Sequence, residues 1–148
     1  MRWGQRLRVG PSKVLAFEVR HWGARLRNDL YRGYNGYVVE TGCYRILFAG
    51  DTGYTDTFKQ VRSRRAVDLA IMPIGSYDPY RRNHCSPEEA WRMSQNAGSD
   101  RLVPVHHGTF RLSREPLHEP LARLLHAVRR CPDRVPILQI GHEFHLDA

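Results

Sequence analysis

The segment spanning residues 44–54 constrains the fold more than any other part of the sequence. An almost continuous apolar run over residues 45–49 ends abruptly in the turn Gly50-Asp51-Thr52-Gly53. This pattern predicts a buried strand that delivers one carboxylate into a tight, glycine-flanked turn. An Asp at the end of a strand often does no more than form an Asx-turn. The residues that accompany Asp51 therefore decide how it is interpreted.

Two histidines have the same kind of position at the ends of other strand-like runs. His21 precedes Asp51 by 30 residues, and His106 follows it by 55 residues. Imidazole nitrogens and carboxylate oxygens are both common zinc ligands. One Asp and two His from three strand ends could therefore converge on a metal ion. For His21 taken alone, a core or surface histidine in a loop is the alternative.

The order of strand-like and helix-like segments predicts an α/β fold of layered elements. We expect strands at 14–19, 36–40, 44–49, 67–74, 101–105 and 135–140, helices at 58–62, 86–96 and 116–130, and a polar loop at 24–35. The helix start at Ser86 is the best defined. Ser86 suits the N-cap, Pro87 the first helical position, and Glu89 the third position of a capping box.

Composition limits the classes of protein that the chain can belong to. Its 148 residues, 41% apolar and 26% charged, predict a single globular domain over residues 1–148. The net charge of +8 comes mainly from scattered Arg residues, so we expect a solvated surface and no specific nucleic-acid partner. The sequence holds no run of 18 apolar residues and no Cys-x-x-Cys pair. A cytoplasmic location, without a transmembrane segment or disulfide framework, is expected.

Five motifs in a fixed order resemble those of the metallo-β-lactamase-fold hydrolases. They lie at 20–22 (Arg-His-Trp), 48–54 (Phe-Ala-Gly-Asp-Thr-Gly-Tyr), 71–77 (Ile-Met-Pro-Ile-Gly-Ser-Tyr), 84–89 (His-Cys-Ser-Pro-Glu-Glu) and 105–110 (Val-His-His-Gly-Thr-Phe). Within that family the chain is most similar to the branch of N-acylphosphatidylethanolamine-hydrolysing phospholipase D and its bacterial relatives.

The resemblance implies an αββα sandwich with two zinc ions at one edge of its sheets. On this analogy His21 is a ligand of the first zinc ion, Asp51 bridges both ions and His106 is a ligand of the second. Asp51 and His84 are the expected catalytic residues, with His84 close to the substrate. The implied reaction is hydrolysis of a phosphodiester or related ester in an anionic, lipid-like substrate, by a hydroxide held between the metal ions.

One departure from the family pattern changes these expectations. The His-x-His-x-Asp-His element that supplies the other ligands does not occur in the sequence. We therefore expect a half or partial sandwich, with a mixed sheet and flanking helices, that corresponds to the C-terminal portion of the family domain. The three remaining ligands predict weak or no metal binding by the isolated chain. The chain would then be a gene fragment, a split subunit or the product of a misplaced start codon.

A non-catalytic or partner-completed half-domain is the alternative function. Loss of one sheet would expose the apolar face of the other, and such faces mark interfaces. A second copy of the chain or a complementary N-terminal half would be the partner. Among other polar residues, Tyr77, Arg81 and Arg82 could contact an anionic head group, whereas His107, His142 and His145 are expected to be structural.

Overall fold

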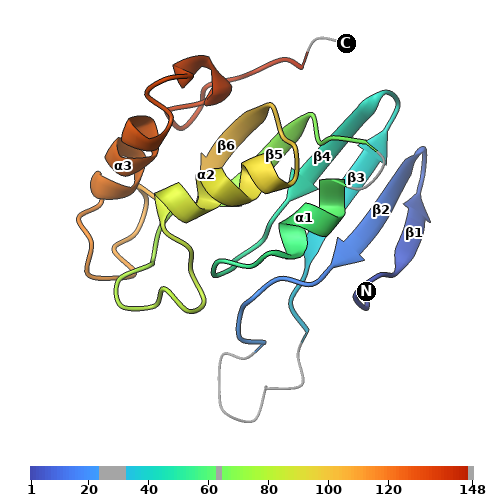
Figure 1. Cartoon of the computed structure of the whole chain (residues 1–148), viewed down its shortest axis with the longest axis horizontal. Coiled ribbons are helices and arrows are strands. Elements are labelled where there is room, and N and C mark those ends of the chain that lie inside the picture. The colour runs from blue at the N-terminus through green and yellow to red at the C-terminus, as the bar shows by residue number, and fades with distance from the viewer. Residues whose placement is uncertain (24–32, 63–64, 147–148) are drawn as a thin grey trace.

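The described residues, 1–23, 33–62 and 65–146 of the computed structural model, form one mixed sheet with helices packed against it (Figure 1). Most of the predicted loop at 24–35 lies outside these residues. The strands are β1 (Arg6–Val9), β2 (Ser12–Phe17), β3 (Gly36–Thr41), β4 (Tyr44–Phe48), β5 (Leu69–Pro73) and β6 (Arg101–Val105). The helices are α1 (Thr57–Arg62), α2 (Pro87–Asn96), α3 (Glu119–Ala127) and the 3-10 helix η2 (Pro132–Arg134).

The sheet has the strands in sequence order, from β1 at one edge to β6 at the other. The first four strands pair antiparallel, whereas β4, β5 and β6 pair parallel. Parallel neighbours need crossover connections, and α1 and α2 provide them between β4 and β5 and between β5 and β6. Both helices lie over the same face of the sheet, and α3 lies beyond the β6 edge (Figure 1). The predicted mixed sheet with flanking helices is confirmed.

Strand alternation places one set of apolar side chains under these helices. Val38, Leu47, Ala70 and Leu102 occupy matching register positions on β3, β4, β5 and β6 and are all buried. They belong to one core cluster with side chains from the helices, such as Phe58 of α1. The core therefore forms between the sheet and the helices, and it fixes the strand ends that carry the candidate site.

The start of α2 follows the predicted capping box. The Ser86 hydroxyl accepts a hydrogen bond from the Glu89 backbone N–H at 3.4 Å, and the Glu89 carboxylate accepts one from the Ser86 N–H at 2.8 Å. Helix α3 is shorter than the predicted 116–130. It begins at Glu119 because Pro120, which has no N–H to donate, fits only in the first turn.

Two expectations about strands at the ends of the chain need correction. The predicted strand at 135–140 is wrong, because the described residues there form no strand after η2. Pro136 lacks the N–H that a ladder needs, and the apolar side chains that follow it line a cavity beside β6 instead. Strand β1 was not predicted from the sequence. Its alternating Arg and apolar residues pair with β2 across a turn in which Gly10 has a φ of 55°.

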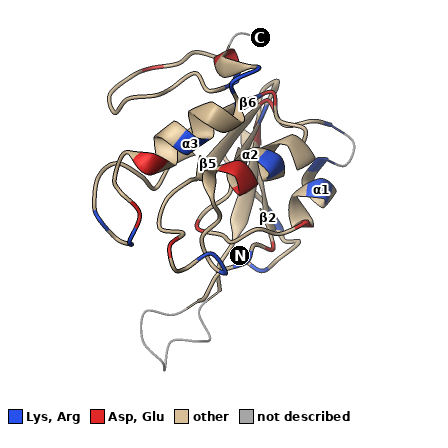
Figure 2. Ribbon diagram, turned by 60° about the vertical axis from the view of Figure 1, so that its left-hand side comes forward, with Lys and Arg blue, Asp and Glu red and all other residues tan. Residues whose placement is uncertain are grey.

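Charged residues are spread over the helices and loops. Figure 2 shows Lys and Arg at separate places along the ribbon, with acidic residues between them. Several basic side chains form ion pairs with nearby carboxylates, such as Arg123 with Glu88 at 2.8 Å. In the described part of the chain, no helix is long and apolar enough to cross a membrane.

Candidate metal centre

The turn after β4 brings three chain segments together through the fully buried Thr52. The Thr52 hydroxyl accepts a hydrogen bond from the Arg20 N–H at 3.0 Å, and the Gly53 N–H donates to the Arg20 carbonyl at 2.7 Å. The Thr52 carbonyl accepts a hydrogen bond from the Cys85 N–H at 2.8 Å. This one residue therefore holds the segments that carry His21 and His84 beside Asp51. Sequence analysis did not assign it a role.

Glycine at position 53 is required by the same arrangement. A Cβ added to Gly53 would lie 2.2 Å from the carbonyl oxygen of Arg82. Any other side chain would push the 82–85 segment away from the turn, because that contact is with backbone rather than with a flexible side chain. The glycine thus allows the close approach that places His84 next to Asp51.

Three of the predicted site residues form a compact cluster. One ligand atom from each of His21, Asp51 and His84 lies within 4.8 Å of the other two. The rings of His21 and His84 meet edge to face, with centroids 5.1 Å apart. Atoms bound to one zinc ion in tetrahedral geometry are separated by about 3.3 Å. A small contraction of the cluster would therefore suit a metal ion.

His106 completes the group from the end of β6. Its Nε2 lies 3.6 Å from Oδ2 of Asp51, and its ring centroid is 5.3 Å from that of His84. Its backbone has a φ of 60°, in the left-handed region that a residue with a side chain rarely adopts. The structure thus brings together all four residues predicted for the site, although sequence analysis placed His84 near the substrate rather than among the ligands.

Unpaired ring nitrogens are concentrated in this cluster. Among the described residues, His21 Nε2, His84 Nδ1 and His106 Nδ1 are buried side-chain nitrogens without a hydrogen-bond partner. The His21 Nδ1 lies 2.8 Å from the Trp22 carbonyl, so this nitrogen carries the proton and Nε2 keeps its lone pair free. Buried polar atoms normally have partners, and a bound metal ion is a partner that suits a free imidazole lone pair.

Burial also sets the charge of the central histidine. Removal from water lowers the pKa of His84 to about 4, and the neighbouring His21 acts in the same direction. The imidazole of His84 is therefore neutral at pH 7, the form that can bind a metal or accept a hydrogen bond. Burial likewise lowers the pKa of His107.

Two of the three residues predicted to contact an anionic head group, Tyr77 and Arg81, have partners within the protein. Tyr77 is buried, and its hydroxyl donates to Glu119 at 2.7 Å. Arg81 donates to Glu89 at 2.8 Å. These bonds connect the loop after β5 with α2 and α3. They indicate a structural role for Tyr77 and Arg81 in this form of the protein.

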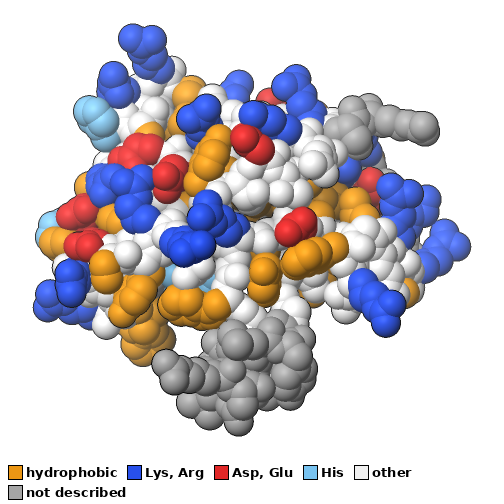
Figure 3. All heavy atoms as spheres, turned by 60° about the horizontal axis from the view of Figure 1, so that its bottom comes forward, with side chains coloured by type: hydrophobic (Ala, Val, Ile, Leu, Met, Phe, Trp, Pro, Cys, Tyr) orange, Lys and Arg blue, Asp and Glu red, His pale blue; other side chains and the backbone are white. Residues whose placement is uncertain are grey.

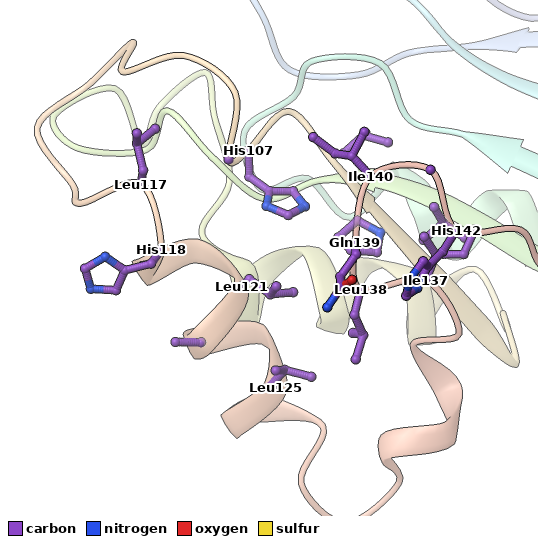
Figure 4. A pocket seen from close by; sticks show the side chains of 16 residues that line it. His107, Leu117, His118, Leu121, Leu125, Ile137, Leu138, Gln139, Ile140 and His142 are labelled. Atoms are coloured by element: carbon purple, nitrogen blue, oxygen red, sulfur yellow. The ribbon is translucent and has the colours of Figure 1, made fainter.

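A cavity of about 840 Å³ lies between β6, α3 and the segment 137–142 (Figure 4). Its wall is mainly aliphatic and includes Leu121 and Leu125 of α3. His107, His118 and His142 also line it, and a structural role for His107 and His142 stays a prediction. His107 directly follows His106 in the chain, although His106 itself does not line the cavity.

The surface near the strand ends mixes apolar and basic groups. On the face shown in Figure 3, Lys and Arg side chains lie among hydrophobic side chains. This mixture differs from the continuous basic stripe that marks a nucleic-acid interface.

Comparison with known proteins identifies a protein family and several relatives. The family model for the beta-lactamase superfamily domain matches residues 1–107. An uncharacterized protein of Mycobacterium tuberculosis is 36% identical over 140 residues, which cover 91% of this chain and 37% of that protein. The mitochondrial N-acyl-phosphatidylethanolamine-hydrolyzing phospholipase D of Saccharomyces cerevisiae is 29% identical over 136 residues, 84% of this chain and 29% of that one. A metal-dependent hydrolase of Methanocorpusculum labreanum is 34% identical over 83 residues, which cover 55% of this chain and 36% of that protein.

A solved structure shows the same arrangement of strands and helices. The metallo-beta-lactamase fold protein YhfI of Bacillus subtilis superimposes with a TM-score of 0.63 at 20% identity, over 87% of this chain and 48% of YhfI. The chain thus spans about a third of the length of the curated relatives and about half of that solved structure. The predicted partial fold is confirmed. The chain belongs to the beta-lactamase superfamily, and its sheet and helices form part of the metallo-β-lactamase fold.

Proposed function

We propose that this chain provides one side of the active site of a metal-dependent hydrolase. The observation that carries the proposal is the cluster of Asp51 with three histidines whose buried ring nitrogens lack partners. Two features support a hydrolase in particular: the family to which the chain belongs, and the name of one relative as a metal-dependent hydrolase.

The donor set suits zinc. His21 and His106 offer imidazole nitrogens, and Asp51 offers a carboxylate with two oxygens that can bridge two ions. A divalent ion held there would supply Lewis acidity toward a phosphoryl or carbonyl oxygen and would lower the pKa of water. Zinc is the ion that we propose. Two zinc ions would occupy a site completed by further ligands, and this chain alone would bind zinc more weakly.

The protein side chains would then orient the reacting groups. Asp51 is exposed enough to reach a ligand, with 43% of its side chain accessible, whereas the His106 side chain is 23% accessible. Neutral His84 can accept a hydrogen bond from a substrate or water without adding positive charge to the site. The buried walls around His84 exclude bulk water, which strengthens each of these interactions.

A phosphodiester or related ester with an apolar tail is the substrate class that we propose. The match to a phospholipase D supports this class. The aliphatic cavity beside His107 supports it independently, since an apolar tail could occupy the cavity while the ester lies near Asp51. Its volume falls in the range of known ligand pockets.

Metal titration of the purified chain tests the proposal. Zn²⁺ affinity would be measured by competition with a chromophoric chelator in the wild type, Asp51→Asn and the control Asp133→Asn, which changes an exposed carboxylate. We expect weak binding that Asp51→Asn removes and Asp133→Asn preserves. Zinc-stimulated hydrolysis of bis(p-nitrophenyl) phosphate would be assayed in parallel. Zinc binding that is unaffected by Asp51→Asn would contradict the proposed centre.

A second candidate function is that of a half-domain completed by a partner. One face of the sheet carries apolar side chains that are partly or largely exposed, such as Phe48 at 43% and Val9 at 62%. Patches of this kind are typical of interfaces. The partner would be a second copy of the chain or another polypeptide with the missing ligands.

A further inference from the structure

We propose that Glu115 is a positioning residue that holds the candidate metal ligand His106 in place through the backbone of the loop after β5. Glu115 lies outside the motifs that identify the family, and its side chain does not belong to the metal cluster. This inference rests on the proposed function, because it assigns Glu115 a role toward a ligand of that site.

The carboxylate of Glu115 accepts three backbone hydrogen bonds from one loop. Its Oε1 accepts from the N–H of Ser76 at 2.6 Å and of Tyr77 at 3.2 Å, and its Oε2 accepts from the N–H of Asp78 at 3.1 Å. Glu115 itself is only 7% exposed. Three donors converging on one buried carboxylate fix the loop in a single conformation, because each would otherwise be an unsatisfied polar group.

The carboxylate is ionised at neutral pH. Burial by itself would raise the pKa of Glu115, but hydrogen bonds from Ser113 and from the loop backbone outweigh this effect and lower the pKa below its usual value. Hydrogen bonds to an ionised acceptor are stronger than those to a neutral one. The loop is therefore held by charge-assisted bonds.

This loop packs directly on the backbone of His106. A Cβ added at Gly75 would lie 2.2 Å from the carbonyl oxygen of His106. The neighbouring Ile74 N–H donates to the Val105 carbonyl at 3.0 Å. Glu115, Ser76 and His106 also line the same small crevice. Any displacement of the loop would consequently be transmitted to the end of β6.

Both ends of this contact have unfavourable backbone conformations. Ser76 has a φ of 66° and His106 a φ of 60°. Such a backbone conformation is unfavourable for a residue with a side chain and persists only where its surroundings enforce it. The bonds from the Ser76 and Tyr77 N–H groups to Glu115 enforce the first conformation, and the packing of Gly75 on His106 supports the second. The His106 ring is thereby kept 3.6 Å from Asp51.

The test compares Glu115→Gln with Glu119→Gln. Glutamine at 115 keeps the side-chain shape but replaces one acceptor oxygen with an amide donor, so at least one loop N–H loses its partner. Glu119 lies nearby and bonds to Tyr77 Oη and Arg123, but not to the loop backbone. Both variants remove hydrogen bonds to the loop, but only the first removes acceptors of its backbone N–H groups. Thermal unfolding would establish that both variants fold.

Two readouts report on His106. In the metal-free protein, ¹⁵N–¹H correlation of the imidazoles should show His106 signals displaced by Glu115→Gln and unchanged by Glu119→Gln. With Zn²⁺ added, Glu115→Gln should weaken affinity about tenfold, the lower end of what loss of an outer support costs. If Glu115→Gln does not fold, Ser113→Ala removes only the hydroxyl that bonds to Glu115 and should displace the same signals to a smaller extent.

The outcomes separate this inference from the proposed function. Zn²⁺ binding that Asp51→Asn leaves unchanged would overturn the proposed function, while the metal-free imidazole signals would still decide the role of Glu115. Unchanged His106 signals in Glu115→Gln, or equal displacement in Glu119→Gln, would overturn the positioning role. Displacement by Glu115→Gln alone would establish it.

Discussion

The two faces of the sheet are built from alternate residues of the same strands, yet they differ greatly in burial. Leu47 is fully buried under the helices, whereas its neighbour Phe48 points to the other face and is 43% exposed. Leu7 and Val9 of β1 lie on the same face as Phe48 and are 44% and 62% exposed. The described residues thus form a complete core on one face and leave an apolar surface on the other.

The second face is partly covered near its β6 end. Arg101 of β6 stacks its guanidinium on the ring of Phe144 at 5.2 Å, and the Tyr44 hydroxyl donates to the Leu146 carbonyl at 2.6 Å. These contacts come from the C-terminal segment and leave Phe48 and β1 exposed. The candidate site therefore depends on the face of the sheet that the helices cover. The turn after β4 and the strand ends that carry the site continue directly from the core on that face.

The largest expected effect comes from truncating matched positions on the two faces. Leu47→Ala should lower the free energy of unfolding by about 2–5 kcal/mol, because it leaves a cavity in a closed core. Phe48→Ala should cost less than about 1 kcal/mol, because much of its ring is already in water. Urea unfolding of both variants measures the difference. Equal losses would show that the second face is as well packed as the first.

A substitution in the turn after β4 tests more directly how the candidate site is held by the helix-covered face of the sheet. Thr52→Val keeps the shape but leaves the Arg20 N–H without its acceptor, so we expect a loss of about 1–3 kcal/mol. The imidazole signals of His21 should shift with it, because the Arg20 backbone holds that histidine beside Asp51. Thr41→Val at the end of β3 is the control, and its His21 signals should match the wild type. A stable Thr52→Val variant with unchanged His21 signals would exclude Thr52 as the organising residue.

Sequence patterns were informative where a local rule determines structure. The capping box at Ser86 and the apolar strand before Asp51 are of this kind, since both depend on neighbours within a few residues. The site residues His21, Asp51, His84 and His106 were found through motifs. Their mutual distances could not be predicted, because those distances depend on the buried Thr52 bridges between segments far apart in the sequence.

The errors arose where tertiary contacts decide the outcome. Residues 135–140 form a mostly apolar run like that of a buried strand, but whether such a segment pairs depends on the strand edge that it meets and on Pro136. Glu115 gave no signal at all in the sequence, because a carboxylate that binds backbone N–H groups has no distinctive spacing. Strand β1 was not predicted, because its four residues pair only with the neighbouring strand β2 and form too short a segment to be recognised in the sequence.

Low pH should destabilise the folded protein, because the buried His84 resists protonation. Because the folded pKa is about 4 and the ordinary value is 6.5, the unfolded chain takes up a proton that the folded chain excludes between these values. Stability should therefore fall as the pH drops from 6.5 to 4, by up to about 3 kcal/mol, with no further loss from this residue below pH 4. In the absence of metal, the His84→Gln variant should lack this part of the dependence of stability on pH. The control His118→Gln, at an exposed position, should retain it.

The smallest effect on folding, and the most direct test of the exposed face, should come from Phe48→Arg. Arginine at a half-exposed strand position can extend into water along its aliphatic stem, so unfolding should change by less than about 1 kcal/mol. If the face binds a second copy of the chain, sedimentation velocity should show wild-type association that increases with concentration and that Phe48→Arg abolishes. The control Lys13→Glu changes charge on the opposite face and should leave association intact. Association that survives Phe48→Arg would place the contact elsewhere, and a wild type that stays monomeric would leave a different polypeptide as the partner for this face.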